Sequence, residues 1–314
     1  MTRTCLIVNP RSGGGSTERR LEELRAAAAA ELGPVELLTT RGPGDATDLT
    51  RRALAEGFGR LIAVGGDGTA NEVVNGFFDG DLALAPAASF ALVHAGTGGD
   101  LVKTLRVPSD PREAFRGIGR RSPVPTDVLH HRFAGHDGSP TERIGINVTG
   151  FGLNGKVVER ANRSSKRFGG RLTFLGATIA SIASYRPVPV AISWMGPDGD
   201  EGRWEGPLSS AFVANGEYCG GGMWVGRGGS MHDGCADLTL LPPLPLHRMI
   251  SGGPRLFSGT IENVKEVSRN LIVRMDAVVA SGNSVLIDID GEQPGLLPIT
   301  IRVLPKALLV TSFR

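Results

Sequence analysis

One segment, residues 61–76, constrains the fold more than any other part of the chain. It opens with the apolar run Leu-Ile-Ala-Val at 61–64, which is typical of a buried strand in a parallel sheet. Residues 65–69, Gly-Gly-Asp-Gly-Thr, follow directly, and residues 70–76 have the pattern of a helix. Glycines let the backbone approach a ligand closely, and the first amides of a helix favour an anion. The segment therefore predicts a phosphate site at the carboxyl end of a sheet.

Asp67 separates this turn from the common nucleotide-binding motifs. The chain contains no Gly-x-x-x-x-Gly-Lys-Ser/Thr loop, and an acid among the glycines is unlike a dinucleotide fingerprint. A carboxylate beside a phosphate is repulsive unless a cation or a proton transfer is involved. We therefore expect Asp67 to hold Mg²⁺ or to accept a proton from an attacking hydroxyl. The alternative is a tight turn in which Asp67 caps the helix that follows.

Strand and helix patterns alternate through about the first 120 residues. This alternation predicts an α/β N-terminal domain with a parallel sheet and helices on both faces. After Arg121 the pattern changes to short strands separated by turn clusters, which predicts a β-rich C-terminal domain. We expect the first domain at residues 1–125 and the second at 126–302.

Three predicted strands end in loops rich in Gly, Ser and Thr, at residues 9–15, 65–69 and 96–100, and a fourth ends at Thr39-Thr40. In doubly wound folds such loops lie along one edge of the sheet, so together they predict a single phosphate-binding edge. Acids also stand in predicted turns, as phosphoryl transfer requires for charge neutralisation and proton removal. For the turn at 290–292 a plain Asp-Gly hairpin is the alternative. These acids are Asp67, Asp100, Asp290 and Glu292.

Charge and composition exclude several classes of protein. The net charge of +2 over 314 residues gives no strong field for nucleic acid. Three cysteines without a Cys-x-x-Cys pair favour a reduced, cytoplasmic chain. No apolar run approaches about 18 residues, so we expect any membrane contact to be peripheral. The basic stretch 160–171 is equally consistent with binding a lipid headgroup and with a solvated loop. The predicted helix 172–184 favours packing in the core over lining an acyl-chain pocket.

Six motifs, in order, resemble those of the diacylglycerol kinase/sphingosine kinase superfamily of lipid kinases, and they span nearly the whole chain. Gly-Gly-Asp-Gly by itself is less specific, because it also occurs in NAD kinases and phosphofructokinases. The matching motifs are Asn-Pro-Arg-Ser-Gly-Gly-Gly at 9–15, Gly-Gly-Asp-Gly-Thr-Ala-Asn-Glu at 65–72, Gly-Thr-Gly-Gly-Asp-Leu at 96–101, Ala-Asn-Gly-Glu-Tyr at 214–218, Met-His-Asp-Gly-Cys at 231–235 and Asp-Gly-Glu at 290–292.

The resemblance implies transfer of the γ-phosphoryl group of ATP, with Mg²⁺, to a lipid hydroxyl. It implies a sandwich-like second domain and a final segment, 303–314, that returns to the first domain. Asp67 and Glu292 would be catalytic, with Asp290 in the same motif as Glu292. Asp233 would hold magnesium together with carbonyl groups of Ser230 and Cys235. The residues implied to bind ATP are Asn9, Thr40, Gly65, Gly66, Gly68, Thr69, Asn71, Glu72, Gly96, Thr97 and Asp100.

Two positions depart from the family pattern. Gly99 stands where the family usually has Asn, and residues 226–231 replace the usual Pro-x-Ala segment before Asp233. One alternative is therefore a nucleotide-binding regulator that has lost catalysis, and another is a small-molecule kinase similar to NAD kinases. The sequence leaves open which lipid is phosphorylated, with diacylglycerol and sphingoid bases both fitting. It also leaves open the oligomeric state, a homodimer included.

Overall fold

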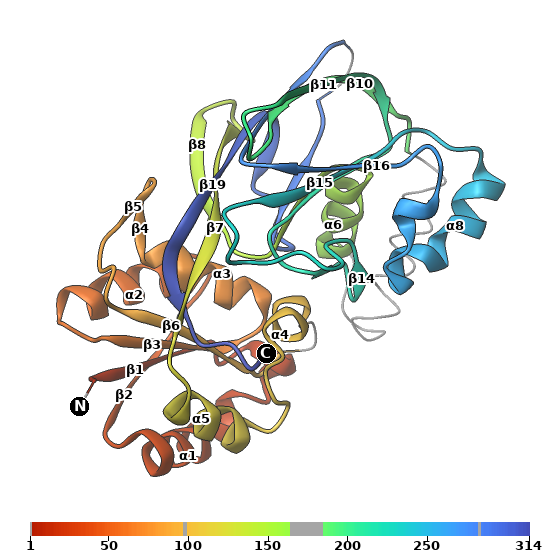
Figure 1. Ribbon diagram of the computed structural model, residues 1–314. Helices are drawn as coiled ribbons and strands as arrows, with labels where there is room; N and C mark the ends of the chain where they lie inside the picture. The colour runs from red at the N-terminus through yellow and green to blue at the C-terminus, as the bar shows by residue number, and fades with distance from the viewer. Residues whose placement is uncertain (1, 97–98, 164–184, 282–283) are drawn as a thin grey trace. The chain divides into compact units, whose positions relative to one another are not determined.

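The computed structural model describes residues 2–96, 99–163, 185–281 and 284–314 of the chain (Figure 1). Residues 1–128 and 306–314 form one compact unit, and residues 129–305 form a second. Strand β19 (Gly295–Val310) therefore contributes to both units, because the chain re-enters the N-terminal unit near its end. The domain limits expected from the sequence, at residues 125 and 303, stay predictions.

The N-terminal unit is built on a parallel sheet, as the alternating pattern predicts. Its strands are β1 (Thr4–Val8), β2 (Val35–Thr39), β3 (Arg60–Gly65) and β6 (Ser89–His94), in the order β2-β1-β3-β6. The last residues of β19 add a parallel strand beside β6. Residues 5–8 and 61–64 are fully buried, so these strands are apolar on both faces, as a covered parallel sheet requires.

Two helices of this unit have an end that a sequence signal marks. Helix α1 ends at Gly33, whose φ of 78° suits a glycine. Asp110 caps α5 by accepting the N–H of Arg112 at 3.1 Å, with Pro111 in the first turn. The helix after the glycine turn begins at Asp67, three residues before the expected start at residue 70. The five helices are α1 (Leu21–Leu32), α2 (Asp45–Ala55), α3 (Asp67–Gly76), α4 (Asp100–Leu105) and α5 (Pro111–Arg120).

Shorter elements complete this unit. Two 3₁₀ turns, Ser12–Gly15 and Glu18–Arg20, lie between β1 and α1. A small hairpin, β4 (Phe78–Asp79) and β5 (Leu82–Ala83), follows α3.

The C-terminal unit contains two mainly antiparallel sheets that share one apolar core, which confirms the β-rich, sandwich-like expectation. Side chains from both sheets, including Ile192, Met275, Phe151 and Leu238, belong to this core. One sheet comprises β7 (Val124–Gly135), β8 (Pro140–Gly145), β10 (Val188–Met195), β11 (Glu201–Leu208), β17 (Arg274–Val279) and β19. The other has the order β16 (Ser268–Ile272), β15 (Ala236–Leu241), β12 (Ser210–Ala214), β9 (Val148–Gly152) and β18 (Ile287–Ile289).

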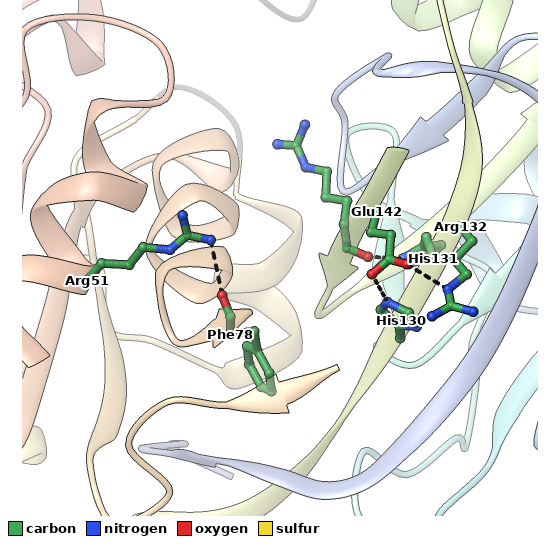
Figure 2. A network of polar contacts seen from close by, with 7 residues as sticks. Arg51, Phe78, His130, His131, Arg132 and Glu142 are labelled. Atoms are coloured by element: carbon green, nitrogen blue, oxygen red, sulfur yellow. Dashed lines mark hydrogen bonds and ion pairs between the residues drawn. The ribbon is translucent and has the colours of Figure 1, made fainter. Parts of the chain in front are cut away.

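Cross-strand polar pairs fix the register of β7 against β8. The carboxylate of Glu142 contacts His130 Nε2 at 3.1 Å and Arg132 Nε at 2.7 Å, as Figure 2 shows. The neighbouring His131 points to the other face, where it is fully buried. Alternation along the strand thus places the exposed Arg132–Glu142 pair on one face and the His131 ring on the other.

Two helices and a small hairpin accompany these sheets in the part of the unit that the structure describes. They are α6 (Leu153–Arg163), α8 (Leu246–Ser258) and the hairpin β13 (Tyr218–Cys219)–β14 (Met223–Trp224), with a 3₁₀ turn at Ile261–Asn263 after α8. None of the helices in the described ranges is long and apolar enough to cross a membrane. The predicted helix 172–184, and the basic stretch from residue 164 onward, lie outside the described residues.

Candidate active site

Loops from four parallel strands meet at the carboxyl edge of the N-terminal sheet, as the sequence predicts. The amide of Asn9 donates to the carbonyl of Val64 at 3.0 Å, and the amide of Ala95 donates to Gly65 at 3.0 Å. The amide of Thr40 donates to the carbonyl of Val8 at 2.9 Å. Backbone hydrogen bonds therefore join the ends of β1, β2, β3 and β6 in one row.

Side chains also tie the first loop (residues 9–15) to the glycine turn at residues 65–69, the signature turn. Asn9 Nδ2 donates to Thr69 Oγ1 at 3.1 Å, and Thr69 is almost fully buried. Gly65 lies against the same threonine, since a Cβ at position 65 would stand 2.6 Å from Thr69 Oγ1. The turn therefore needs glycine at 65 if Thr69 is to reach Asn9.

The first loop also closely approaches Ala95, the residue that precedes the third loop (residues 96–100). A Cβ at Gly13, where φ is 59°, would stand 3.0 Å from the carbonyl oxygen of Ala95. Thr17 Oγ1 donates to that carbonyl at 3.3 Å. Residues 13–15 all have positive φ, which explains the run of three glycines in this loop. The arrangement is suited to a phosphate chain lying along the sheet edge.

Asp67 caps a neighbouring helix rather than its own. Its Oδ2 accepts the amide of Asp100 at 3.1 Å, and its Oδ1 accepts the amide of Leu101 at 3.3 Å. These are the first two amides of α4, whereas the N-cap of α3 is Gly66. Asp67 therefore joins the signature turn to the third loop.

The acid of the third loop is paired with a lysine one helical turn later. Asp100 Oδ1 lies 3.0 Å from Lys103 Nζ, and Asp100 is 9% exposed. Lys103 thus brings a positive charge to the start of α4, and the sequence analysis did not identify this residue. The i, i+3 spacing of an acid and a lysine at the start of a helix could have predicted the pair.

Gly99, the first departure from the family pattern, lies beside Val102 and His94. A Cβ at residue 99 would lie 3.2 Å from Val102 Cβ, a tight contact, and 3.4 Å from His94 Cε1, an ordinary van der Waals contact. His94 Nδ1 is buried and has no hydrogen-bond partner among the described residues, and burial lowers the pKa of this half-buried ring, which favours its neutral form. Thr97 lies outside the described residues.

Two of the expected ATP-binding side chains make structural contacts within the unit. Glu72 accepts the amides of Gly44 at 2.9 Å and Ala46 at 3.2 Å, so its carboxylate caps the first turn of α2. Asn71 is fully buried, and its carbonyl oxygens accept from Asn75 Nδ2. Nucleotide contacts for Asn71 and Glu72 stay predictions, as they do for Gly66, Gly68 and Gly96 in the same loops.

In the C-terminal unit, Asp290 and Glu292 have different surroundings. The buried carboxylate of Asp290 accepts three backbone amides, from Ile146 and Asn147 at 2.9 Å and from Val148 at 3.1 Å. Glu292 is exposed and follows a two-residue turn closed by hydrogen bonds between Ile289 and Glu292 at 2.8 and 3.0 Å. Positive φ values of 51° and 87° at 290 and 291 are those of the Asp-Gly hairpin considered above. The turn therefore presents Glu292 to solvent.

The predicted magnesium segment is a short polar turn. Asp233 Oδ1 accepts the amide of Cys235 at 3.1 Å, and Ser230 Oγ accepts the amide of His232 at 3.2 Å. Asp233 is exposed and Cys235 is buried. Across the described residues, no group of three or more His, Cys, Asp or Glu side chains is arranged to hold a metal. The donors available here are one carboxylate and carbonyl oxygens, the ligand type that Mg²⁺ accepts alongside water.

A parallel sheet with glycine loops gathered at one edge, followed by a unit of two antiparallel sheets, defines an α/β protein with an attached β-sandwich. Residues 3–131 match the model of the diacylglycerol kinase catalytic domain. Residues 147–312 match the model of the YegS C-terminal NAD kinase beta sandwich-like domain. The chain belongs to the diacylglycerol kinase superfamily of lipid kinases, which confirms the resemblance found in the sequence.

Similar proteins come from several bacteria. The chain is 28% identical over 291 residues to the "Probable lipid kinase YegS-like" protein of Stenotrophomonas maltophilia (strain K279a), covering 91% of this chain and 88% of that protein. It is 28% identical over 225 residues to the protein of the same name from Pseudomonas aeruginosa (strain UCBPP-PA14), covering 70% and 68%.

Solved structures have the same fold. A Bacillus anthracis str. Sterne protein described as a "putative diacylglycerol kinase" superposes with a TM-score of 0.77 at 24% identity, over 99% of this chain and 95% of that one. Yeast NADH kinase complexed with NADH superposes with a TM-score of 0.53 at 14% identity, over 98% and 82%. At these identities the likeness concerns the fold.

Proposed function

We propose that the chain is an ATP-dependent lipid kinase that transfers the γ-phosphoryl group to the hydroxyl of a diacylglycerol, a sphingoid base or a related lipid. The convergence of the loops after β1, β3 and β6 at one sheet edge, joined by Asp67, carries the proposal. Phosphoryl transfer depends mostly on positioning and charge neutralisation, and backbone amides at a helix start supply the first. Family membership supports the lipid as acceptor.

In this proposal the N-terminal unit binds ATP and braces the phosphates. Asn9, Thr40, Thr97 and the signature turn would contact the nucleotide, with Gly65, Gly66, Gly68, Thr69 and Gly96 giving the backbone close access. Asp67 would hold the third loop through its bonds to the first two amides of α4, and it would also bind the metal ion. Lys103 would offset the charge of Asp100 beside the phosphates.

Bound Mg²⁺ would neutralise charge on the phosphates. The oxygen donors of Asp233, with carbonyl groups of Ser230 and Cys235, are the ligands proposed for one ion. Asp233 is exposed and therefore accessible to a hydrated cation. Its carboxylate is oriented by the amide of Cys235, which leaves further acceptor positions open.

Glu292 would accept the proton of the lipid hydroxyl. Its exposure on a tight turn supports this role, because a general base must reach the reacting group. Asp290 would act through the backbone, since its carboxylate is surrounded by three amides. We therefore assign Asp290 a positioning role within the catalytic motif. The proposal also includes a cytoplasmic enzyme that meets its lipid as a peripheral membrane protein.

The test is a lipid panel assayed with γ-labelled ATP and Mg²⁺ in mixed micelles, with thin-layer separation of the products. We expect label in a phospholipid for at least one long-chain alcohol and none in NAD. Labelled NADP would instead identify a kinase of the NAD kinase type. This alternative is included because yeast NADH kinase has the same fold. ATP binding without transfer to any acceptor would identify a catalytically degenerate regulator.

A further inference from the structure

The three C-terminal sequence motifs meet at one end of the sheet β16-β15-β12-β9-β18. Ala214, the last residue of β12, pairs with Val148 at the start of β9 and with Asp237 near the start of β15. Ile289, the last residue of β18, pairs with Thr149 of β9. The segments that adjoin these residues therefore lie at the same end of the sheet. They are residues 146–147, 215–218, 230–235 and 290–292.

Asn147, which immediately precedes β9, is bonded to the segments on both sides of it. Its amide N–H donates to Asp290 Oδ1 at 2.9 Å. Its carbonyl oxygen accepts the amides of Asn215 at 2.9 Å and Gly216 at 2.8 Å. Its side-chain Nδ2 donates to the carbonyl of Tyr218 at 2.8 Å. Asn147 thus joins the turn that contains Asp290 to the loop that follows β12.

Two asparagine side chains cross between this loop and the start of β9. Asn147 reaches Tyr218, and Asn215 Nδ2 donates to the carbonyl of Ile146 at 2.7 Å. Both asparagines are buried, with exposed fractions of 4% and 2%. The backbone bonds of residue 147 would form with any amino acid, whereas the bond to Tyr218 needs a side-chain donor of this length. The identity of residue 147 therefore matters through its side chain.

The loop after β12 also holds the chain that leads to Asp233. The amide of Gly226 donates to the carbonyl of Glu217 at 3.1 Å. A Cβ at position 226 would stand 2.2 Å from the carbonyl oxygen of Gly216, so this backbone contact requires a glycine. A displacement of the loop would therefore reach the segment with Asp233 on one side and the turn with Glu292 on the other.

We propose that Asn147 is a positioning residue for phosphoryl transfer. Through Asp290 and Tyr218 it fixes Glu292 relative to the loop after β12 and to the predicted magnesium segment. The inference rests on the proposed function, because it takes Glu292 as the general base. Misplacing a reacting group by about 1 Å can lower a rate about 100-fold, so a buried side chain that does not touch the substrate can still control turnover.

Asn147→Ala tests this role, because it removes the side-chain bond and keeps the backbone bonds. We expect kcat for lipid phosphorylation to fall at least about tenfold, with the KM for ATP unchanged. The matched control is Asn154→Ala, just beyond the other end of β9, where Nδ2 donates to the carbonyl of Ala211 at 3.1 Å. It should lower the melting temperature as Asn147→Ala does, yet leave kcat close to that of wild type. Asn147→Ser replaces Asn147→Ala if the latter does not fold.

A double-mutant cycle with Glu292→Gln separates positioning from a general loss of structure. Because Asn147 acts through Glu292 in this proposal, Asn147→Ala should lower turnover little further once the carboxylate is gone. Two residues that act independently would instead give fold-losses that multiply. Single-turnover reactions with γ-labelled ATP measure all four proteins.

Hydrogen exchange tests the same link without any reaction. Asn147→Ala should speed exchange severalfold at the amide of Glu292, which donates to Ile289 at 3.0 Å, whereas Asn154→Ala should not. The proposal is overturned by wild-type turnover or exchange in Asn147→Ala, by an equal loss of turnover in Asn154→Ala, or by losses that multiply in the cycle. Failure of the proposed function has a different signature, because wild type then phosphorylates no lipid while the exchange difference between the two asparagine variants remains.

Discussion

The carboxylate of Asp67 accepts the backbone amide of Asp100 at 3.1 Å, across 33 residues of sequence. This bond, with its partner to Leu101, makes the acid of the signature turn the N-terminal cap of α4. The turn after β3 and the loop after β6 are therefore mechanically coupled. A change in either one moves the backbone that would face the nucleotide phosphates.

Replacing Asp67 by Ala is expected to cost far more activity than stability. Loss of a helix cap lowers the free energy of unfolding by about 1 kcal/mol, which shifts the melting temperature by only a few degrees. Turnover should fall about 100-fold or more, because the phosphate loops lose their brace. The matched control is Asp110→Ala, which removes the cap of α5 and its 3.1 Å bond to Arg112. Equal activity losses in the two variants would contradict the assignment.

The other end of α4 is held by the last residues of the chain. Phe313 N donates to Leu105 O at 2.8 Å, and Arg314 Nε donates to Thr104 O at 2.9 Å. Phe313 also packs on Gly117 of α5, where a Cβ would stand 2.2 Å from its ring. We expect Arg314→Ala to speed hydrogen exchange at the amides of Asp100 and Leu101 and to raise the KM for ATP severalfold.

Two variants control for this effect. Arg314→Lys keeps a cation at the negative end of α4 and should restore much of the protection. Arg116→Ala removes the exposed α5 arginine that pairs with Glu31 and should leave exchange in α4 unchanged. Unaltered exchange in Arg314→Ala would show that the tail does not position the third loop.

The two acids at 290–292 should separate activity from stability. Glu292→Gln is expected to reduce turnover about 10²–10⁴-fold with an unchanged melting temperature, because the residue is exposed. Asp290→Asn turns an NH₂ group toward a buried backbone amide and should lower the free energy of unfolding by at least about 2 kcal/mol. Denaturant unfolding together with initial rates measures both. Wild-type stability in Asp290→Asn would contradict the structural role of Asp290, and wild-type activity in Glu292→Gln would contradict the catalytic role of Glu292.

Stability should fall in acid because of His131. Burial lowers the pKa of this imidazole from 6.5 to about 3. The ring is held neutral, with Nδ1 donating to the carbonyl of Arg143 at 3.0 Å and Nε2 accepting from the hydroxyl of Thr149 at 2.7 Å. The unfolded chain therefore binds one more proton than the folded chain between the two pKa values. The contribution is complete above pH 6.5 and decreases by about 1.4 kcal/mol per pH unit as the pH falls toward 3.

Chemical unfolding of wild type and His131→Gln at several pH values measures this contribution. The difference in unfolding free energy between the two proteins should shrink steadily below pH 6.5. His136→Gln, at an exposed histidine, serves as the control and should parallel wild type. A difference that does not depend on pH would mean that His131 is not the group responsible.

Short sequence patterns predicted the strands and turns whose conformation depends on neighbouring residues. The strand, turn and helix at 61–76, the parallel order of the N-terminal strands and the gathering of their loops follow from apolar runs and glycines. The Asp-Gly turn at 290–291 follows from the dipeptide itself. Helix α8 escaped prediction because Gly252-Gly253-Pro254 lies inside it, a sequence with poor helix propensity that packing on β14 overrides.

Long-range hydrogen bonds account for most of what the sequence could not predict. The carboxylate of Asp67 accepts a backbone amide about 33 residues later in the chain, and that of Asp290 accepts three amides more than 140 residues earlier. Nothing near either residue in sequence specifies these partners. The motifs identified which acids matter, whereas the fold was needed to distinguish a capping carboxylate from an exposed one.

Titration calorimetry with Mg²⁺ and a non-hydrolysable ATP analogue tests the central claim most directly, by comparing wild type with Gly65→Ala. The new methyl group would stand 2.6 Å from Thr69 Oγ1 and separate Thr69 from Asn9, so the account predicts that affinity falls at least about tenfold. Gly253→Ala, in a position with open space around it, should bind like wild type. Undiminished affinity in Gly65→Ala would contradict an ATP site at the edge where β1, β3 and β6 end.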